Sequence, residues 1–108
     1  MYPQTMAQNR NNINPYVMQR VLTASPEQLI SYVYDVAISS CANEDRYKAT
    51  KAVQELINAL NFDYKEQSLT FFRIYRYILN NIHKGNFSEA QKLLTDIKRA
   101  WVQAMQVE

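Results

Sequence analysis

Apolar residues recur at helical spacing in four long segments of the chain, and polar stretches separate these segments. Within each segment they fall at intervals of three and four residues, the repeat of an amphipathic helix with one buried face. No segment alternates apolar and polar residues as a half-buried strand would. We therefore expect an all-α protein.

The first long helix has a clear start signal. Ser25 can act as the N-cap, Pro26 suits the first helical position, and Gln28 completes a capping box. Apolar positions continue as far as Cys41, and we expect this helix to end near Ala42.

A second helix follows, and Asn43 can serve as its N-cap. It places apolar residues from Ala49 to Leu60 on one face, with lysine and glutamate on the other. The sequence "NFDYKEQ" at residues 61–67 then breaks the apolar repeat, which predicts a connection here.

A third helix is predicted from about Glu66 to Lys84, ending at Gly85 in a left-handed C-cap. A fourth is predicted to start after Asn86 or Ser88 and to carry apolar residues as far as Met105.

Helices of about 16 to 19 residues, or roughly 25 to 28 Å, with short connections favour antiparallel neighbours. The expected architecture is an up-down-up-down four-helix bundle in residues 25–108, a single domain. Residues 1–12 are polar and are expected to be a mobile N-terminus. Residues 13–24 form a short helical or extended leader.

Two of the helices carry more apolar surface than a small bundle needs. An apolar stripe of about 100° suffices, but the third helix covers roughly 160° and the first about half its circumference. Surplus apolar surface must be covered by something. The leader, with apolar residues such as Val17 and Val21, can be a flap that shields a groove and yields to a partner. Alternatively, it is a permanent fifth element of the core.

Tyrosines contribute much of this apolar surface. Tyr32, Tyr34, Phe72 and Tyr75 can be either core fillers or binding anchors, and the tyrosine hydroxyls favour an exchangeable interface. Trp101 is expected in the core of the last helix.

Charge and chemistry point away from catalysis. The net charge is +2, with one histidine and one cysteine. The chain lacks a Glu-x-x-His pair, a nucleophile near a base and a glycine-rich phosphate loop. We expect no enzyme activity, cofactor, metal site or nucleic-acid partner, with Cys41 a small, partly buried side chain and His83 at a helix end. A signal peptide and a membrane-spanning stretch are also missing, so we expect a cytoplasmic protein without membrane insertion.

Several motifs, in order, resemble those of the flagellin export chaperone family, FliS. They are "NPY" at residues 14–16, "TASPEQLI" at 23–30, "VYDVAI" at 33–38, "IYRYI" at 74–78 and "RAW" at 99–101. The resemblance covers about residues 13–105. It implies a non-enzymatic chaperone with an antiparallel helical bundle. Such proteins bind the disordered C-terminal segment of flagellin, prevent its premature polymerisation and deliver it to the flagellar export gate.

The resemblance also assigns residues to roles. In the family, the Asn-Pro-Tyr segment packs over the flagellin-binding groove when the partner is absent. The expected flap and partner-binding residues are Asn14, Pro15, Tyr16, Val17, Val21, Leu29, Val33, Tyr34, Ile38, Phe72 and Tyr75.

The chain also departs from the family pattern. Val36 stands where the family usually has a glycine, and it adds bulk where a partner helix would approach closely. A glycine-containing turn before the third helix is also missing. Two other functions stay open: a regulatory adaptor that binds another flagellar regulator in the same groove, and a structural homodimer that buries its surplus apolar face against a second copy.

Overall fold

The computed structural model describes residues 23–105, and within that range every regular element is an α-helix. The expected all-α fold is confirmed. The predicted flap residues Asn14, Pro15, Tyr16, Val17 and Val21 lie outside the described residues. The helices are α2 (Pro26–Ala42), α3 (Arg46–Asn58), α4 (Lys65–His83) and α5 (Phe87–Met105).

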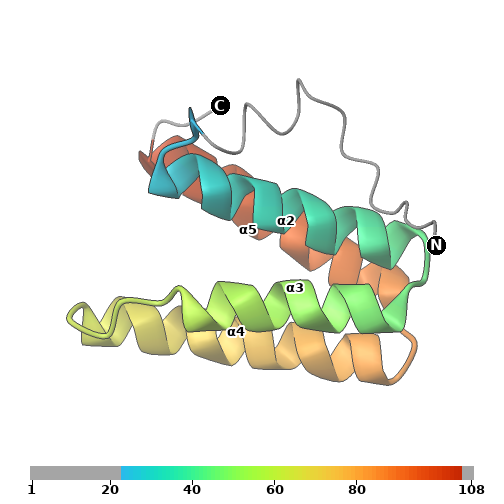
Figure 1. Ribbon diagram of the computed structural model, residues 1–108. Helices are drawn as coiled ribbons and strands as arrows, with labels where there is room; N and C mark the ends of the chain where they lie inside the picture. The colour runs from blue at the N-terminus through green and yellow to red at the C-terminus, as the bar shows by residue number, and fades with distance from the viewer. Residues whose placement is uncertain (1–22, 106–108) are drawn as a thin grey trace, which may run out of the picture.

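The four helices form two layers. Helices α2 and α5 make one layer and α3 and α4 the other, with successive helices running in opposite directions (Figure 1). Contacts join α2 to α3, α2 to α5, α3 to α4, and α4 to α5. The four helices therefore occupy the corners of a square, and the predicted up-down-up-down bundle is confirmed.

The predicted start of α2 is confirmed in detail. The Ser25 hydroxyl accepts a hydrogen bond from the Gln28 amide at 3.1 Å, and the Gln28 side chain accepts one from the Ser25 amide at 3.0 Å. This capping box satisfies two N–H groups that have no partner within the helix.

The predicted cap of α3 is wrong by two residues. Asn43 is the C-cap of α2 instead, and its backbone N–H bonds to carbonyls of that helix. The turn then needs a left-handed residue, which is Glu44 at a φ of 55°. Asp45 is left to cap α3, and its carboxylate accepts a hydrogen bond from the Lys48 amide at 3.1 Å.

Gly85 ends α4 as predicted. Its φ is 82°, in the left-handed region that glycine enters at little cost. Asn86 directly precedes α5 and its carbonyl accepts from the Ala90 amide at 3.1 Å, whereas Ser88 lies inside the helix.

Helix α3 is shorter than expected, at 13 residues beside the 19 of α4. The Arg46 guanidinium donates to the Ile82 carbonyl at 3.3 Å, so α3 begins level with the end of α4. The first one or two turns of α4 therefore have no α3 beside them, a difference of about 9 Å. The connection covers part of this stretch, where the Ser68 hydroxyl donates to the Asn61 carbonyl at 2.5 Å.

The core runs between the two layers. Cys41 is part of it at 1% exposure, more fully buried than expected, and its burial raises the pKa of the thiol. The described helices include none that is long and apolar enough to cross a membrane. The buried apolar residues are Tyr34, Ala37, Cys41, Ala49, Ala52, Val53, Leu56, Tyr75, Ile78, Ile82, Ala90 and Leu94.

Candidate partner-binding site

Four aromatic rings form a continuous chain across three helices. The Phe71 and Tyr75 centroids of α4 are 6.0 Å apart, and Tyr75 lies 6.5 Å from Tyr34 of α2. Tyr34 in turn lies 5.9 Å from Trp101 of α5. All three pairs are tilted rather than stacked, within the centroid range of favourable aromatic contacts. We call this set the aromatic chain.

The middle of the aromatic chain is sealed. Tyr34 is 0% and Tyr75 4% exposed, and their hydroxyls lie 2.6 Å apart in a hydrogen bond. Burial raises the pKa of Tyr34, and the neighbouring Tyr75 raises it further. Burial also raises the pKa of Tyr75, although the hydrogen bond to Tyr34 opposes that change. Both hydroxyls therefore stay neutral inside the bundle, and one hydrogen bond joins them.

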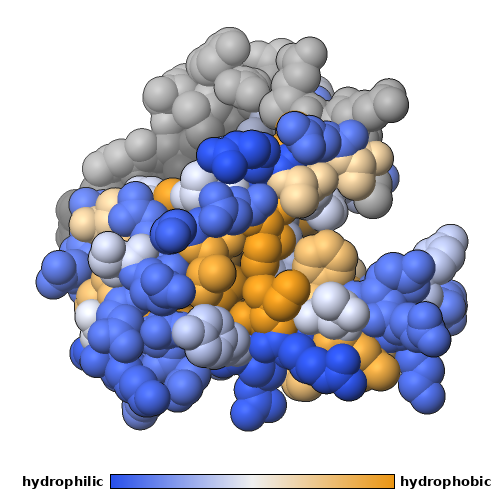
Figure 2. Space-filling model, turned by 180° about the vertical axis from the view of Figure 1, so that it is seen from behind, coloured by the Kyte–Doolittle hydropathy of each residue, from blue (hydrophilic) through white to orange (hydrophobic). Residues whose placement is uncertain are grey.

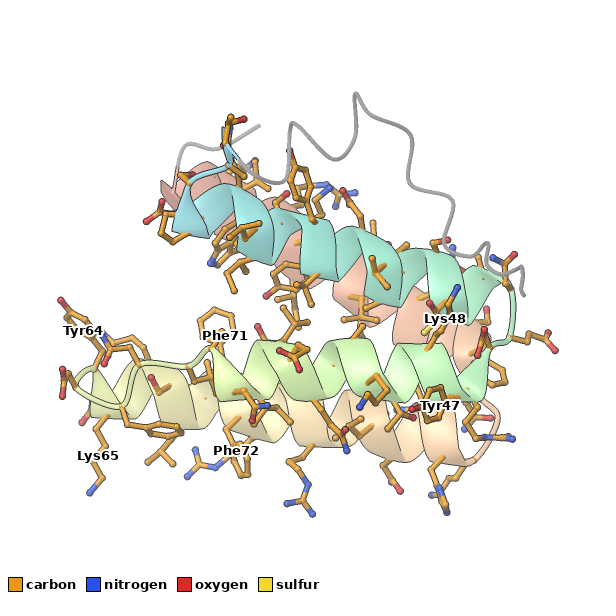
Figure 3. All side chains as sticks on the ribbon, viewed as in Figure 1. Tyr47, Lys48, Tyr64, Lys65, Phe71 and Phe72 are labelled. Carbon is orange, nitrogen blue, oxygen red and sulfur yellow. The ribbon has the colours of Figure 1, made fainter. Side chains whose placement is uncertain are left out.

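The two ends of the aromatic chain are only partly buried. Phe71 and Trp101 both pack against the core without being enclosed by it. Figure 3 shows Phe71 directed from α4 toward the α2 and α5 layer. The rings thus lead from the core to its edge at both ends.

An apolar recess lies at the same end of the bundle. Figure 2, which looks from behind onto α4 and α5, shows a hydrophobic area between the two layers, hollowed on the side of the α3–α4 connection. We define the apolar recess by the partly buried apolar side chains that pack against the core in this half of the bundle. These are Ile30, Val33, Ile57, Leu60, Phe71, Ile74, Ile97 and Trp101.

The short α3 accounts for the position of the recess. Because α3 ends at Asn58, no helix occupies the fourth corner of the square beside the beginnings of α2 and α4 and the end of α5. Their apolar stripes continue into this region, since a helix keeps its apolar face over its whole length. Leu29, in the first turn of α2, is 40% exposed.

The structure brings together some of the predicted partner-binding residues. Leu29 and Val33 lie on α2 in the half that holds the recess. Tyr34 and Tyr75 were expected at the partner surface but lie in the core, where one hydroxyl donates a hydrogen bond to the other and so lowers the cost of burying both. They form the base beneath the recess rather than its surface.

Two predicted residues lie elsewhere. Ile38 is partly buried in the opposite half of α2, near the turn to α3. Phe72 points away from the α2 and α5 layer, unlike Phe71 (Figure 3). Adjacent residues on a helix point about 100° apart, so only one of the two rings can reach the recess.

Sequence reasoning missed Phe71, Ile97 and the surface role of Trp101. The spacing of Phe71 and Tyr75, four residues apart, is a signal that both rings share one face of α4. Trp101 was expected in the core, and it packs against the core but is only partly buried.

The described residues hold no group of three or more metal-ligating side chains. His83 is the last residue of α4, as predicted, where a cation favourably meets the helix dipole. Cys41 is enclosed in the core and unavailable to a substrate. The side chains that define the recess are aliphatic or aromatic, so they offer apolar contacts.

Comparison with protein-family models finds no match, and neither comparison with curated proteins nor comparison with solved structures finds a relative.

Proposed function

We propose that the chain is a cytoplasmic flagellin export chaperone of the FliS type. It holds the disordered C-terminal segment of flagellin on the apolar recess, which prevents premature polymerisation before export. The observation that carries the proposal is the aromatic chain, sealed at its centre and open at Phe71 and Trp101. The ordered motifs from "NPY" to "RAW" supply the identity of the partner.

The recess suits a helical segment that folds as it binds. An amphipathic helix docks by placing apolar side chains at intervals of three and four residues into a groove. Phe71 and Trp101 offer partly exposed rings for these contacts, and Leu29 adds an exposed aliphatic side chain. Ordering the client offsets several kcal/mol of the gross contact energy, so a large surface gives moderate affinity.

Calorimetric titration with a peptide spanning the last few dozen residues of flagellin from the same organism tests the proposal. We expect binding with a negative heat-capacity change, the signature of apolar burial and coupled folding. Leu29→Glu should weaken binding by about tenfold or more, because the client would bury an unpaired carboxylate. Tyr47→Ser is the control, since Tyr47 is 72% exposed at the opposite end of α3.

Three outcomes would contradict the proposal. A folded protein that does not bind the flagellin peptide would favour the regulatory adaptor. Equal effects of the Leu29 and Tyr47 substitutions would place the client outside the recess. Light scattering can be used to test the homodimer. A molar mass that rises to twice the monomer value with concentration, together with a monomeric Leu29→Glu variant, would favour it.

A further inference from the structure

The outer face of α3 and α4 combines positive charge with aromatic rings. The Arg76 guanidinium lies 5.7 Å from the centroid of Phe72, and the Lys51 ammonium lies 5.9 Å from that of Tyr47. Tyr47 is 72% and Tyr77 54% exposed. We call these five residues, together with the exposed Arg73 of α4, the basic aromatic face. Figure 3 shows Tyr47 and Phe72 on the α3 and α4 layer, away from α2 and α5.

A shallow depression runs through this face between the two helices. Thr50 and Gln54 line it from α3, and Leu79, Asn80 and His83 line it from α4, together with Arg76 and Tyr77. Its lining combines amide, hydroxyl and guanidinium groups with aromatic and aliphatic edges. Such a mixture can hydrogen-bond a peptide backbone while it packs against side chains.

Charge is distributed unevenly between the layers. No Asp or Glu lies between Glu66 and Glu89, a stretch that contains Arg73 and Arg76. Helix α2, by contrast, contains Glu27 and Asp35 and no lysine or arginine. The ion pairs among the described residues are Asp35 with Lys98 and Asp96 with Arg99.

The positive charges on α4 therefore have no carboxylate partner within the described part of the chain. Arg73 and Arg76 are three residues apart and lie on one side of the helix. A guanidinium fork binds a carboxylate through paired, charge-assisted hydrogen bonds. Two guanidinium groups beside exposed tyrosines complement a segment that carries both acidic and apolar side chains.

We propose that the basic aromatic face is a second docking site, which binds an acidic peptide segment of a partner protein that also carries aromatic or aliphatic residues. A nucleic acid fits less well. Proteins that bind it firmly neutralise about six to ten phosphates, and this face offers only the lysine and the two arginines. Tyrosine and arginine, by contrast, are enriched at protein interfaces.

The second site is separate from the apolar recess. Phe71 points toward the other layer, whereas Phe72 points away from it (Figure 3). The two surfaces therefore share a helix but not a face. A client in the recess and an acidic segment on the basic aromatic face can be bound at the same time.

Selection from a display library of random 16-residue peptides, with the intact chain as the target, tests the proposal. We expect the selected peptides to be enriched in Asp and Glu and in aromatic residues relative to the starting library. A synthetic copy of the most enriched peptide should bind more weakly at high salt, because exposed charges are screened.

Matched charge-reversal variants locate the site. Arg73→Glu with Arg76→Glu should weaken binding of that peptide by about tenfold or more. Lys48→Glu with Lys92→Glu makes the same change in net charge at exposed positions outside the face, and should leave most of the affinity. If the double glutamate variant loses its helical circular dichroism, Arg76→Gln serves instead and should weaken binding several-fold.

The proposal is overturned if the selected peptides show no acidic enrichment, or if the control variant loses as much affinity as the test variant. It is also overturned if a labelled single-stranded oligonucleotide binds this face more tightly than the selected peptide. These measurements do not involve flagellin, so they test the second site independently of the recess.

Discussion

The hydroxyls of Tyr34 and Tyr75 lie 2.6 Å apart and serve as each other's hydrogen-bond partner in the interior of the bundle. Their helices, α2 and α4, are not neighbours among the main helix contacts but occupy opposite corners of the square. The pair therefore joins the two layers diagonally. It also lies beneath the apolar recess, at the boundary between the core and the surface.

Removing one hydroxyl of this pair should lower the free energy of unfolding more than removing both. Tyr34→Phe leaves the Tyr75 hydroxyl buried without a partner, and we expect a loss of about 1 to 3 kcal/mol in the free energy of unfolding. Tyr75→Phe should act similarly, whereas the double variant should lie close to the natural protein. Urea unfolding of the four proteins checks this, and simply additive losses would contradict the pairing.

The same pair should weaken the fold at alkaline pH. Burial raises the pKa of both tyrosines in the folded chain, so in the unfolded chain they ionise first, near the ordinary value of 10.0. The free energy of unfolding should be constant below that range and fall as the pH rises through it, by about 1.4 kcal/mol per pH unit for each group. Urea midpoints measured from neutral to alkaline pH provide the test.

Two variants isolate the contribution of the tyrosines to this alkaline loss. Cys41 has a raised pKa for the same reason, so the series is best measured in a Cys41→Ala background. Tyr34→Phe with Tyr75→Phe should then make the alkaline decline shallower. An unchanged slope would show that other groups cause it.

Gly85 should resist replacement because of its backbone and not because of crowding. A Cβ at this position would lie 3.5 Å from the Arg46 guanidinium, an ordinary contact, but the φ of 82° strains any other residue. We expect Gly85→Ala to lower the free energy of unfolding by about 1 kcal/mol and Gly85→Asn to lower it less. Thermal unfolding of both variants checks this, and equal losses would contradict it.

Substitutions of two isoleucines of α4 should distinguish a core position from a recess position by their effects on stability. Ile78 is 0% exposed, and Ile78→Ala should cost about 2 to 5 kcal/mol through the cavity that it leaves. Ile74 is only partly buried at the recess, and Ile74→Ala should cost about 1 kcal/mol, since less apolar area is lost. In client titrations Ile74→Ala should weaken binding, and an unchanged affinity would remove Ile74 from the site.

Trp101 should report on occupation of the recess. It is the only tryptophan of the chain, so its fluorescence can be followed without labelling. A client that covers the partly buried indole should shift its emission to shorter wavelength as water leaves the ring. Calorimetric binding without any spectral change would place the client elsewhere.

Much of the fold can be predicted because its signals are local. The capping box of Ser25 and Gln28 and the left-handed Gly85 each act over a few residues, and both were found where the sequence indicated. Asn43 was misassigned because it and Asp45 both suit an N-cap. The left-handed Glu44 between them decides the choice, and that is a property of the folded turn.

The site could be predicted only in outline. Apolar stripes wider than a bundle needs indicated a groove, and Leu29 and Val33 do lie in its half of α2. Tyr34 and Tyr75 are 41 residues apart, so nothing local in the sequence shows that their hydroxyls meet. Such a pairing depends on how far the two helices are shifted relative to each other along the bundle axis, and the connections determine that shift.

Helix α3 ends after 13 residues, and this length determines how far the recess extends between the layers. Each added residue lengthens a helix by about 1.5 Å and turns its apolar face by about 100°, so insertions of about one turn are the ones that keep that face toward the core. One inserted turn before Asn58 would move the connection outward by about 5.4 Å and cover part of the opening, with no side chain of the recess replaced. The capacity of this bundle for a partner is thus tunable by insertion and deletion, a route along which it can change in discrete steps without rebuilding its core.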